Sequence, residues 1–150
     1  MHKFGKIVIY LILIIAFTVL MGFMAEGESS AGGNLAANKA IISRLGELWN
    51  TGNLAIADEI FDADFVNHDP SDPKITNLES YKGYVAAIRT GFPDFHVTTE
   101  DLIAEGGKVV VRWIITATHQ GEFAGIPATD IKATWTGMTI WRFAGGKLVV

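Results

Sequence analysis

The side chains of this chain best suited to proton transfer are two histidines with carboxylates close by. His119 is followed three positions later by Glu122. An imidazole can take or give a proton near neutral pH, for example at an enol or enolate, and a carboxylate can orient that imidazole or act as the base itself. The competing interpretation is that His119 is hydrogen-bonded to hold the loop at 120–129 and that Glu122 is a solvated loop residue.

The second histidine, His68, is followed directly by Asp69 and Pro70. An Asp-Pro pair is typical of a turn in which the aspartate side chain caps neighbouring amides, and this is the preferred interpretation of Asp69. His68, Asp69, His119 and Glu122 offer nitrogen and oxygen ligands, but no two histidines have the close spacing of a common metal motif. We therefore expect no metal site.

Arginines and aromatic residues are the candidates for contact with a ligand. Arg112 and Arg142 stand among apolar neighbours in predicted strands, and a buried guanidinium needs a partner. Either could clamp an anionic group or a polarised carbonyl, or pair with a carboxylate at a subunit interface. Several aromatic residues are expected to line a flat apolar cavity that suits a ring-containing ligand, although most such residues in proteins are simply core. They are Tyr81, Tyr84, Trp113, Phe123, Trp135 and Trp141.

Composition excludes several classes of function. The chain has 150 residues, a formal net charge of −4 and no cysteine. Without cysteine there is no disulfide, thiolate nucleophile or cysteine-ligated metal. The scattered basic residues form no stripe for a nucleic acid, which is not expected as a partner. The sequence contains no nucleophile-elbow, P-loop or dinucleotide-binding motif.

The N-terminus predicts export. Lys3 and Lys6 precede an apolar run at 7–25, and a Gly/Ser/Ala-rich stretch at 26–35 is typical of a flexible linker. The order of these segments is typical of a signal peptide, while the length of the run also suits a membrane anchor. In both cases the basic residues predict that the rest of the chain is delivered outward, so the protein is expected to be exported or membrane-tethered by 7–25. No other contact with a membrane is expected.

The remaining chain, 36–150, is expected to form one α+β domain. Apolar residues recur at helical spacing over 37–49, 54–61 and 78–90, with Gly91 and Pro93 stopping the last helix. From residue 95 onward the period changes to two, which predicts strands over 95–105, 108–119, 131–143 and 147–150. Glycine pairs at 106–107 and 145–146 predict hairpin turns. Helices followed by an antiparallel meander predict helices packed on one face of a curved sheet.

Alternation along the predicted strands assigns side chains to the two faces. Val109, Val111, Trp113, Ile115, Ala117 and His119 fall on one face, and Arg112 falls on the other. In the next long strand, Trp135 and Trp141 share one face, and Met138 and Ile140 the other. Because both faces carry bulky groups, we expect the second face to be covered by another copy of the chain.

Five segments of the chain resemble the SnoaL-like polyketide cyclases of the nuclear-transport-factor-2-like superfamily. They are Phe65 to Pro70 (FVNHDP), Phe92 to Asp94 (FPD), Ile103 to Trp113, Thr118 to Thr129 (THQGEFAGIPAT) and Gly137 to Lys147. The resemblance covers nearly all of 38–150. It implies a conical half-barrel, in which a curved antiparallel sheet wraps around three helices and encloses a cavity, usually in a homodimer.

The resemblance also implies a chemistry, namely ring closure of polyketide esters by aldol condensation without a metal or organic cofactor. It makes His68 a candidate pocket residue. Members are expected to carry a catalytic carboxylate on the strand after the THQGEF loop, but 131–135 contains none, and Asp130 is the nearest. Relatives are also expected to continue past Val150, so a truncated form is one interpretation.

Two hypotheses about the function follow from these observations. The first is a cofactor-free cyclase or related lyase or isomerase, with His119, Glu122 and Asp130 moving a proton next to a carbonyl. The alternative is a non-catalytic extracytoplasmic protein that binds a small apolar ring-containing or ester ligand. The missing strand carboxylate and the predicted export favour the second, and the resemblance favours the first.

Overall fold

The computed structural model describes residues 35–68 and 73–150. The predicted leader, the linker before Leu35, and Asp69 with Pro70 lie outside the described residues. Among those described, no helix combines the length and apolar character needed to cross a membrane.

Three helices form where the apolar spacing predicts them: α2 (Leu35–Thr51), α3 (Ala55–Ile60) and α4 (Leu78–Gly91). Helix α4 begins with a capping box. The Asn77 side chain accepts a hydrogen bond from the Ser80 backbone amide at 2.9 Å, and the Ser80 hydroxyl accepts one from the Asn77 amide at 3.0 Å. These two bonds satisfy amides that would otherwise lack partners at the first turn.

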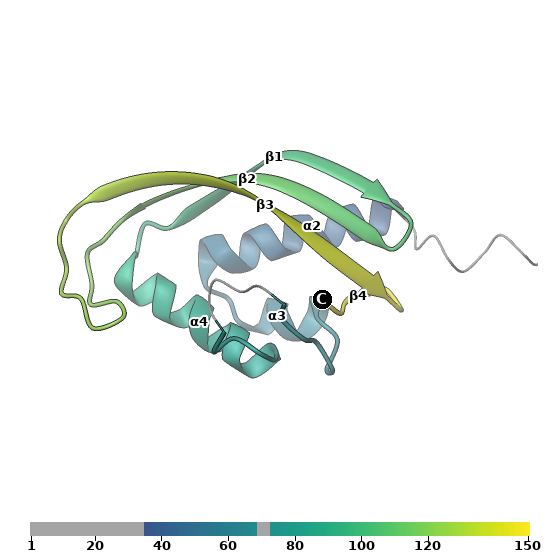
Figure 1. Ribbon diagram of the computed structural model, residues 1–150, viewed down its shortest axis with the longest axis horizontal. Helices are drawn as coiled ribbons and strands as arrows, with labels where there is room; N and C mark the ends of the chain where they lie inside the picture. The colour runs from purple at the N-terminus through teal and green to yellow at the C-terminus, as the bar shows by residue number, and fades with distance from the viewer. Residues whose placement is uncertain (1–34, 69–72) are drawn as a thin grey trace, which may run out of the picture. The chain divides into compact units, whose positions relative to one another are not determined.

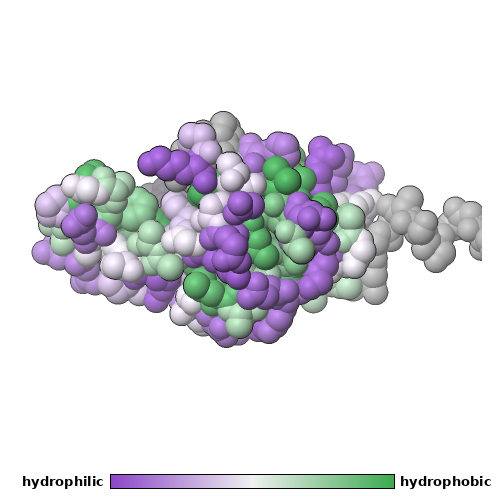
Figure 2. Space-filling view, turned by 90° about the horizontal axis from the view of Figure 1, so that it is seen from below, coloured by the Kyte–Doolittle hydropathy of each residue, from purple (hydrophilic) through white to green (hydrophobic). Residues whose placement is uncertain are grey.

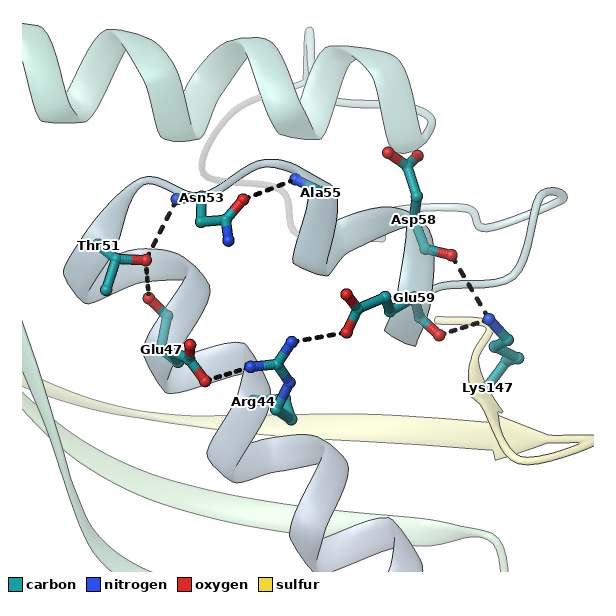
Figure 3. A network of polar contacts seen from close by, with 8 residues as sticks. All are labelled: Arg44, Glu47, Thr51, Asn53, Ala55, Asp58, Glu59 and Lys147. Carbon is teal, nitrogen blue, oxygen red and sulfur yellow. Dashed lines mark hydrogen bonds and ion pairs between the residues drawn. The ribbon is translucent and has the colours of Figure 1, made fainter.

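Surface contacts join the first two helices to the end of the chain (Figure 3). Arg44 on α2 forms ion pairs with Glu47 and, at 2.6 Å, with Glu59 on α3. Lys147 donates hydrogen bonds to the backbone carbonyls of Asp58 and Glu59. Because the side chains of both ion pairs are largely exposed, water screens them and each pair contributes little, so the buried core must supply most of the stability.

Four antiparallel strands follow in the order β1-β2-β3-β4: β1 (His96–Glu105), β2 (Lys108–Thr118), β3 (Lys132–Ala144) and β4 (Lys147–Leu148). The three long strands agree with the predicted ones to within a residue at each end, and the last is shorter. Gly106 and Gly145, in the two hairpin turns, have φ values of +55° and +56°, which glycine adopts without strain. The α+β fold class predicted from the sequence is confirmed.

The sheet arches over the helices, with α2 beneath its middle and α3 and α4 further below (Figure 1). Alternation in β2 is confirmed: Val109, Val111 and Ala117 are buried. Figure 2, which views the helix side, shows a mostly hydrophilic surface with hydrophobic patches near its middle. The opposite face of the sheet leaves Ile103, Met138 and Ile140 exposed by 68%, 72% and 60%. The predicted second copy that would cover this outer face stays a prediction.

Candidate functional site

A cavity of about 620 Å³ lies between the inner face of the sheet and helices α2 and α4. This volume suits a small organic molecule. All four tryptophans of the chain are among the lining residues, as are Tyr81, Tyr84 and Phe95. Aliphatic residues, including Ile42, Leu45, Ile88, Val111 and Ile115, complete most of the wall. Of the predicted ligand contacts, His68, Tyr81, Trp113, Trp135 and Trp141 do line the cavity.

Two features set the position of Trp113: the lack of a β-carbon at Gly137 and a hydrogen bond to Thr139. Gly137 lies opposite Trp113 in the β2–β3 register, and a β-carbon there would come within 2.4 Å of the indole ring. The indole therefore covers the glycine. Its Nε1 donates a hydrogen bond to Thr139 Oγ1 at 3.0 Å, which fixes the direction of the ring.

A second indole is held by a tyrosine. Trp49 Nε1 on α2 donates a hydrogen bond to the Tyr81 hydroxyl on α4 at 2.9 Å, and the two rings meet edge to face at 5.7 Å. Burial raises the pKa of the Tyr81 phenol well above its ordinary value. Tyr81 is thus a neutral phenol in the cavity wall at any ordinary pH.

Few polar side chains complete the lining. They are Asn67, His68, Thr99 and Thr139, and no Asp, Glu, Lys or Arg side chain of the described residues joins them. The Asn67 amide donates a hydrogen bond to the Ile75 carbonyl at 3.0 Å, so part of its hydrogen-bonding capacity is already used within the protein. His68 is exposed and is the only imidazole of the described residues that lines the cavity.

His119 does not line the cavity. Its ring stacks on Phe92 with 5.0 Å between centroids, Nδ1 lies 3.1 Å from Thr129 Oγ1, and Nε2 is buried without a partner among the described residues. Its backbone carbonyl accepts hydrogen bonds from the amides of Thr129 and Asp130. These contacts match the competing interpretation of His119, that it holds the loop at 120–129.

The other two predicted catalytic residues also lie outside the cavity. Glu122 is exposed and, with Phe123, borders a separate shallow hollow beside α4. Asp130 is exposed at the end of the loop, with a φ of +58°. The structure therefore does not bring Glu122 or Asp130 into the cavity, and the predicted ligand contact Phe123 packs against Phe92 instead.

Arg112 lies on the outer face of the sheet. Its guanidinium pairs with Asp101, with 2.8 Å between Nε and Oδ2, and with Glu100, both from the neighbouring strand β1. Its partners thus come from its own chain, and its predicted contact with a ligand does not fit this placement. Arg142 is likewise exposed.

Trp49, Asn67 and Thr99 are lining residues that the sequence did not predict. Trp49 falls on the apolar side of its helix, but helical spacing cannot distinguish a core position from a cavity wall. Within the described ranges, no three His, Cys, Asp or Glu side chains come close enough together to hold a metal ion.

Comparison with known proteins places this chain in a family. The family model for SnoaL-like polyketide cyclases matches residues 39–150. A search of curated proteins found no match.

Solved structures give the same result. A candidate polyketide cyclase from Acidithiobacillus ferrooxidans is 32% identical, with a TM-score of 0.66 over 75% of this chain and 83% of that one. IdmH, a candidate polyketide cyclase from Streptomyces antibioticus, is 28% identical, with a TM-score of 0.63 over 74% and 86%. AclR, a candidate hydroxylase from Streptomyces galilaeus, is 27% identical, with a TM-score of 0.69 over 77% and 73%. The chain belongs to the SnoaL-like polyketide cyclase family.

Proposed function

We propose that this protein binds a small apolar molecule with a ring and a ketone or ester carbonyl, and transfers a proton at the carbon next to that carbonyl. Membership of the family supports a cyclase- or isomerase-type function in general. The observation that carries the finer proposal is the 620 Å³ aromatic cavity with one imidazole among the described residues of its lining.

The lining supports an uncharged ligand with a flat ring. Tryptophan and tyrosine side chains offer large apolar faces and edges to such a ring. A charged group would lose its hydration in the cavity without meeting an oppositely charged side chain from the described residues, which is costly. A neutral ketone or ester avoids that cost.

His68 is the proposed proton carrier, because an imidazole can exchange a proton near neutral pH and His119 lies outside the cavity. In a ring closure, His68 would take a proton from the carbon next to the carbonyl and leave an enolate. The enolate carbon then forms a bond to a second carbonyl carbon of the same molecule. The alkoxide that results takes the proton back from His68, so the reaction needs no oxidant or reductant.

A second candidate function is binding without turnover. The specific observation in its favour is that no carboxylate side chain of the described residues lines the cavity. AclR, which is named a candidate hydroxylase, also indicates that similarity to this fold does not select one reaction.

The bicyclic ketone 2-tetralone can distinguish these candidates. Binding is measured by quenching of tryptophan fluorescence, and catalysis by the rate at which the hydrogens next to the carbonyl exchange for deuterium in D₂O. We expect wild-type protein to accelerate the exchange and His68→Asn to reduce that acceleration by roughly 100-fold or more. His96→Asn is the matched control, because His96 is exposed on β1 and does not line the cavity.

Three other outcomes of this experiment would each lead to a different conclusion. Binding of 2-tetralone without acceleration by the wild type supports the binding-only function. Loss of exchange in His119→Asn but not in His68→Asn refutes the assignment of the proton carrier. Absence of binding refutes the proposed ligand class.

A further inference from the structure

The hydroxyl of Tyr81 has a hydrogen-bonding capacity that the cavity wall does not use. The Trp49 indole can only donate, so the Tyr81 oxygen is the acceptor in their 2.9 Å bond. The phenol's own proton is therefore not engaged there. Within 35–68 and 73–150 we find no acceptor for that proton.

Burial of the Tyr81 side chain keeps its hydroxyl proton from reaching water. The side chain is only 6% exposed. Its ring contacts Phe61 at 5.0 Å, Phe65 at 5.7 Å and Trp141 at 6.5 Å between centroids. A buried donor without a partner is costly, and the remaining direction open to the hydroxyl is the cavity that Tyr81 lines.

We propose that the Tyr81 hydroxyl donates a hydrogen bond to the carbonyl oxygen of the ligand, and that Trp49 is a positioning residue that strengthens this donor. This rests on the proposed function, which places a carbonyl in the cavity. A hydroxyl that accepts one hydrogen bond is a better donor in a second one, because the two bonds polarise each other. The bond would strengthen further as negative charge builds on the carbonyl oxygen during enolate formation.

Other polar lining groups are less suited to this role. The Asn67 amide already donates to the Ile75 carbonyl. Thr139 Oγ1 accepts the Trp113 indole proton, as Tyr81 accepts that of Trp49, but an alkyl hydroxyl is a weaker hydrogen-bond donor than the more acidic phenol. Burial raises the pKa of Tyr81, so the phenol keeps its proton and remains a donor over the whole working pH range.

The test compares 2-tetralone with tetralin, which has the same two rings and no carbonyl. We expect Tyr81→Phe to lower the ratio of the two affinities, ketone over hydrocarbon, by about 3- to 10-fold relative to wild type. Thr90→Ala, which removes another hydroxyl of helix α4 from an exposed side chain that does not line the cavity, is expected to leave that ratio unchanged.

The infrared stretch of the bound carbonyl gives an independent readout. We expect a lower frequency in wild type than in cyclohexane, a return toward the cyclohexane value in Tyr81→Phe, and an intermediate value in Trp49→Phe. A purely structural role for the Trp49–Tyr81 bond would not move this frequency.

An unchanged affinity ratio with an unchanged frequency in Tyr81→Phe overturns the inference, as does a loss of the preference for the ketone in Thr90→Ala alone. If Tyr81→Phe does not fold, the wild-type frequency decides, since a value equal to that in cyclohexane overturns the inference. Failure of both molecules to bind wild type refutes the proposed function instead, so the two failures are distinguishable.

Discussion

Gly137→Ala tests whether close packing between two strands shapes the cavity. A β-carbon at Gly137 would lie 2.4 Å from Cζ2 and 2.6 Å from Cη2 of Trp113, which is closer than van der Waals contact allows. The indole must move, and its hydrogen bond to Thr139 Oγ1 must stretch or break. The substitution therefore perturbs a cavity wall without changing any charge.

The expected loss of stability combines three contributions. Overpacking costs about 1–3 kcal/mol, and loss of the hydrogen bond costs about 1 kcal/mol. Replacing a strand glycine by alanine recovers about 0.5–1 kcal/mol of backbone entropy. The net change is about 1–3 kcal/mol, or a Tm lower by roughly 4–12 °C for a domain of this size.

Thermal unfolding followed by circular dichroism measures this change, and the affinity for 2-tetralone measures its effect on the cavity. We expect weaker binding, because the displaced indole enters the space of the ligand. Gly83→Ala is the control: Gly83 lies in α4, where an added β-carbon would meet no atom within 4 Å, so alanine should stabilise the protein by up to about 1 kcal/mol. If Gly137→Ala melts no lower than wild type and binds equally well, the packing argument is refuted.

Two further predictions concern acid stability and assembly. Hydrogen bonds from the Thr118 hydroxyl at 2.7 Å and the Thr118 amide at 2.6 Å hold the pKa of Asp94 below its ordinary 3.8, so this contribution is present above about pH 4 and is lost as the pH falls further. Asp94→Asn should lower the Tm at pH 7, with the difference from wild type shrinking below pH 4; a pH-independent difference would contradict this. We also propose that a second copy covers the outer face of the sheet, so Ile140→Glu should convert a dimer to a monomer in light scattering, whereas Ile131→Glu, at another exposed position outside the strands, should not. A wild-type monomer would refute the proposed dimer.

Much of the fold could be predicted because it depends on local patterns. Helical spacing predicted α2 and α4, and glycine pairs predicted both hairpin turns. Alternation along β2 correctly separated Val111 and Trp113 on the inner face from Arg112 on the outer face. These features depend only on neighbours in the chain and on which face of an element is buried, so they can be predicted from the sequence.

The position of His119 could not be predicted in the same way. Alternation placed His119 on the inner face, but β2 ends at Thr118, and beyond a strand end the period of two no longer governs direction. Stacking on Phe92 and hydrogen bonds to the loop then decide where the ring lies.

The residue pattern therefore predicts the helices and strands of this protein, the sides on which the strand residues lie, and the resemblance to its family. The packing of the folded chain settles which aromatic residues line a cavity and which fill the core. It brought Trp49 and Tyr81 together from two helices and placed Trp113 over Gly137 from two strands. The physical reason is that a cavity is a property of the space between elements, set by the curvature of the sheet and by the packing of side chains far apart in the chain.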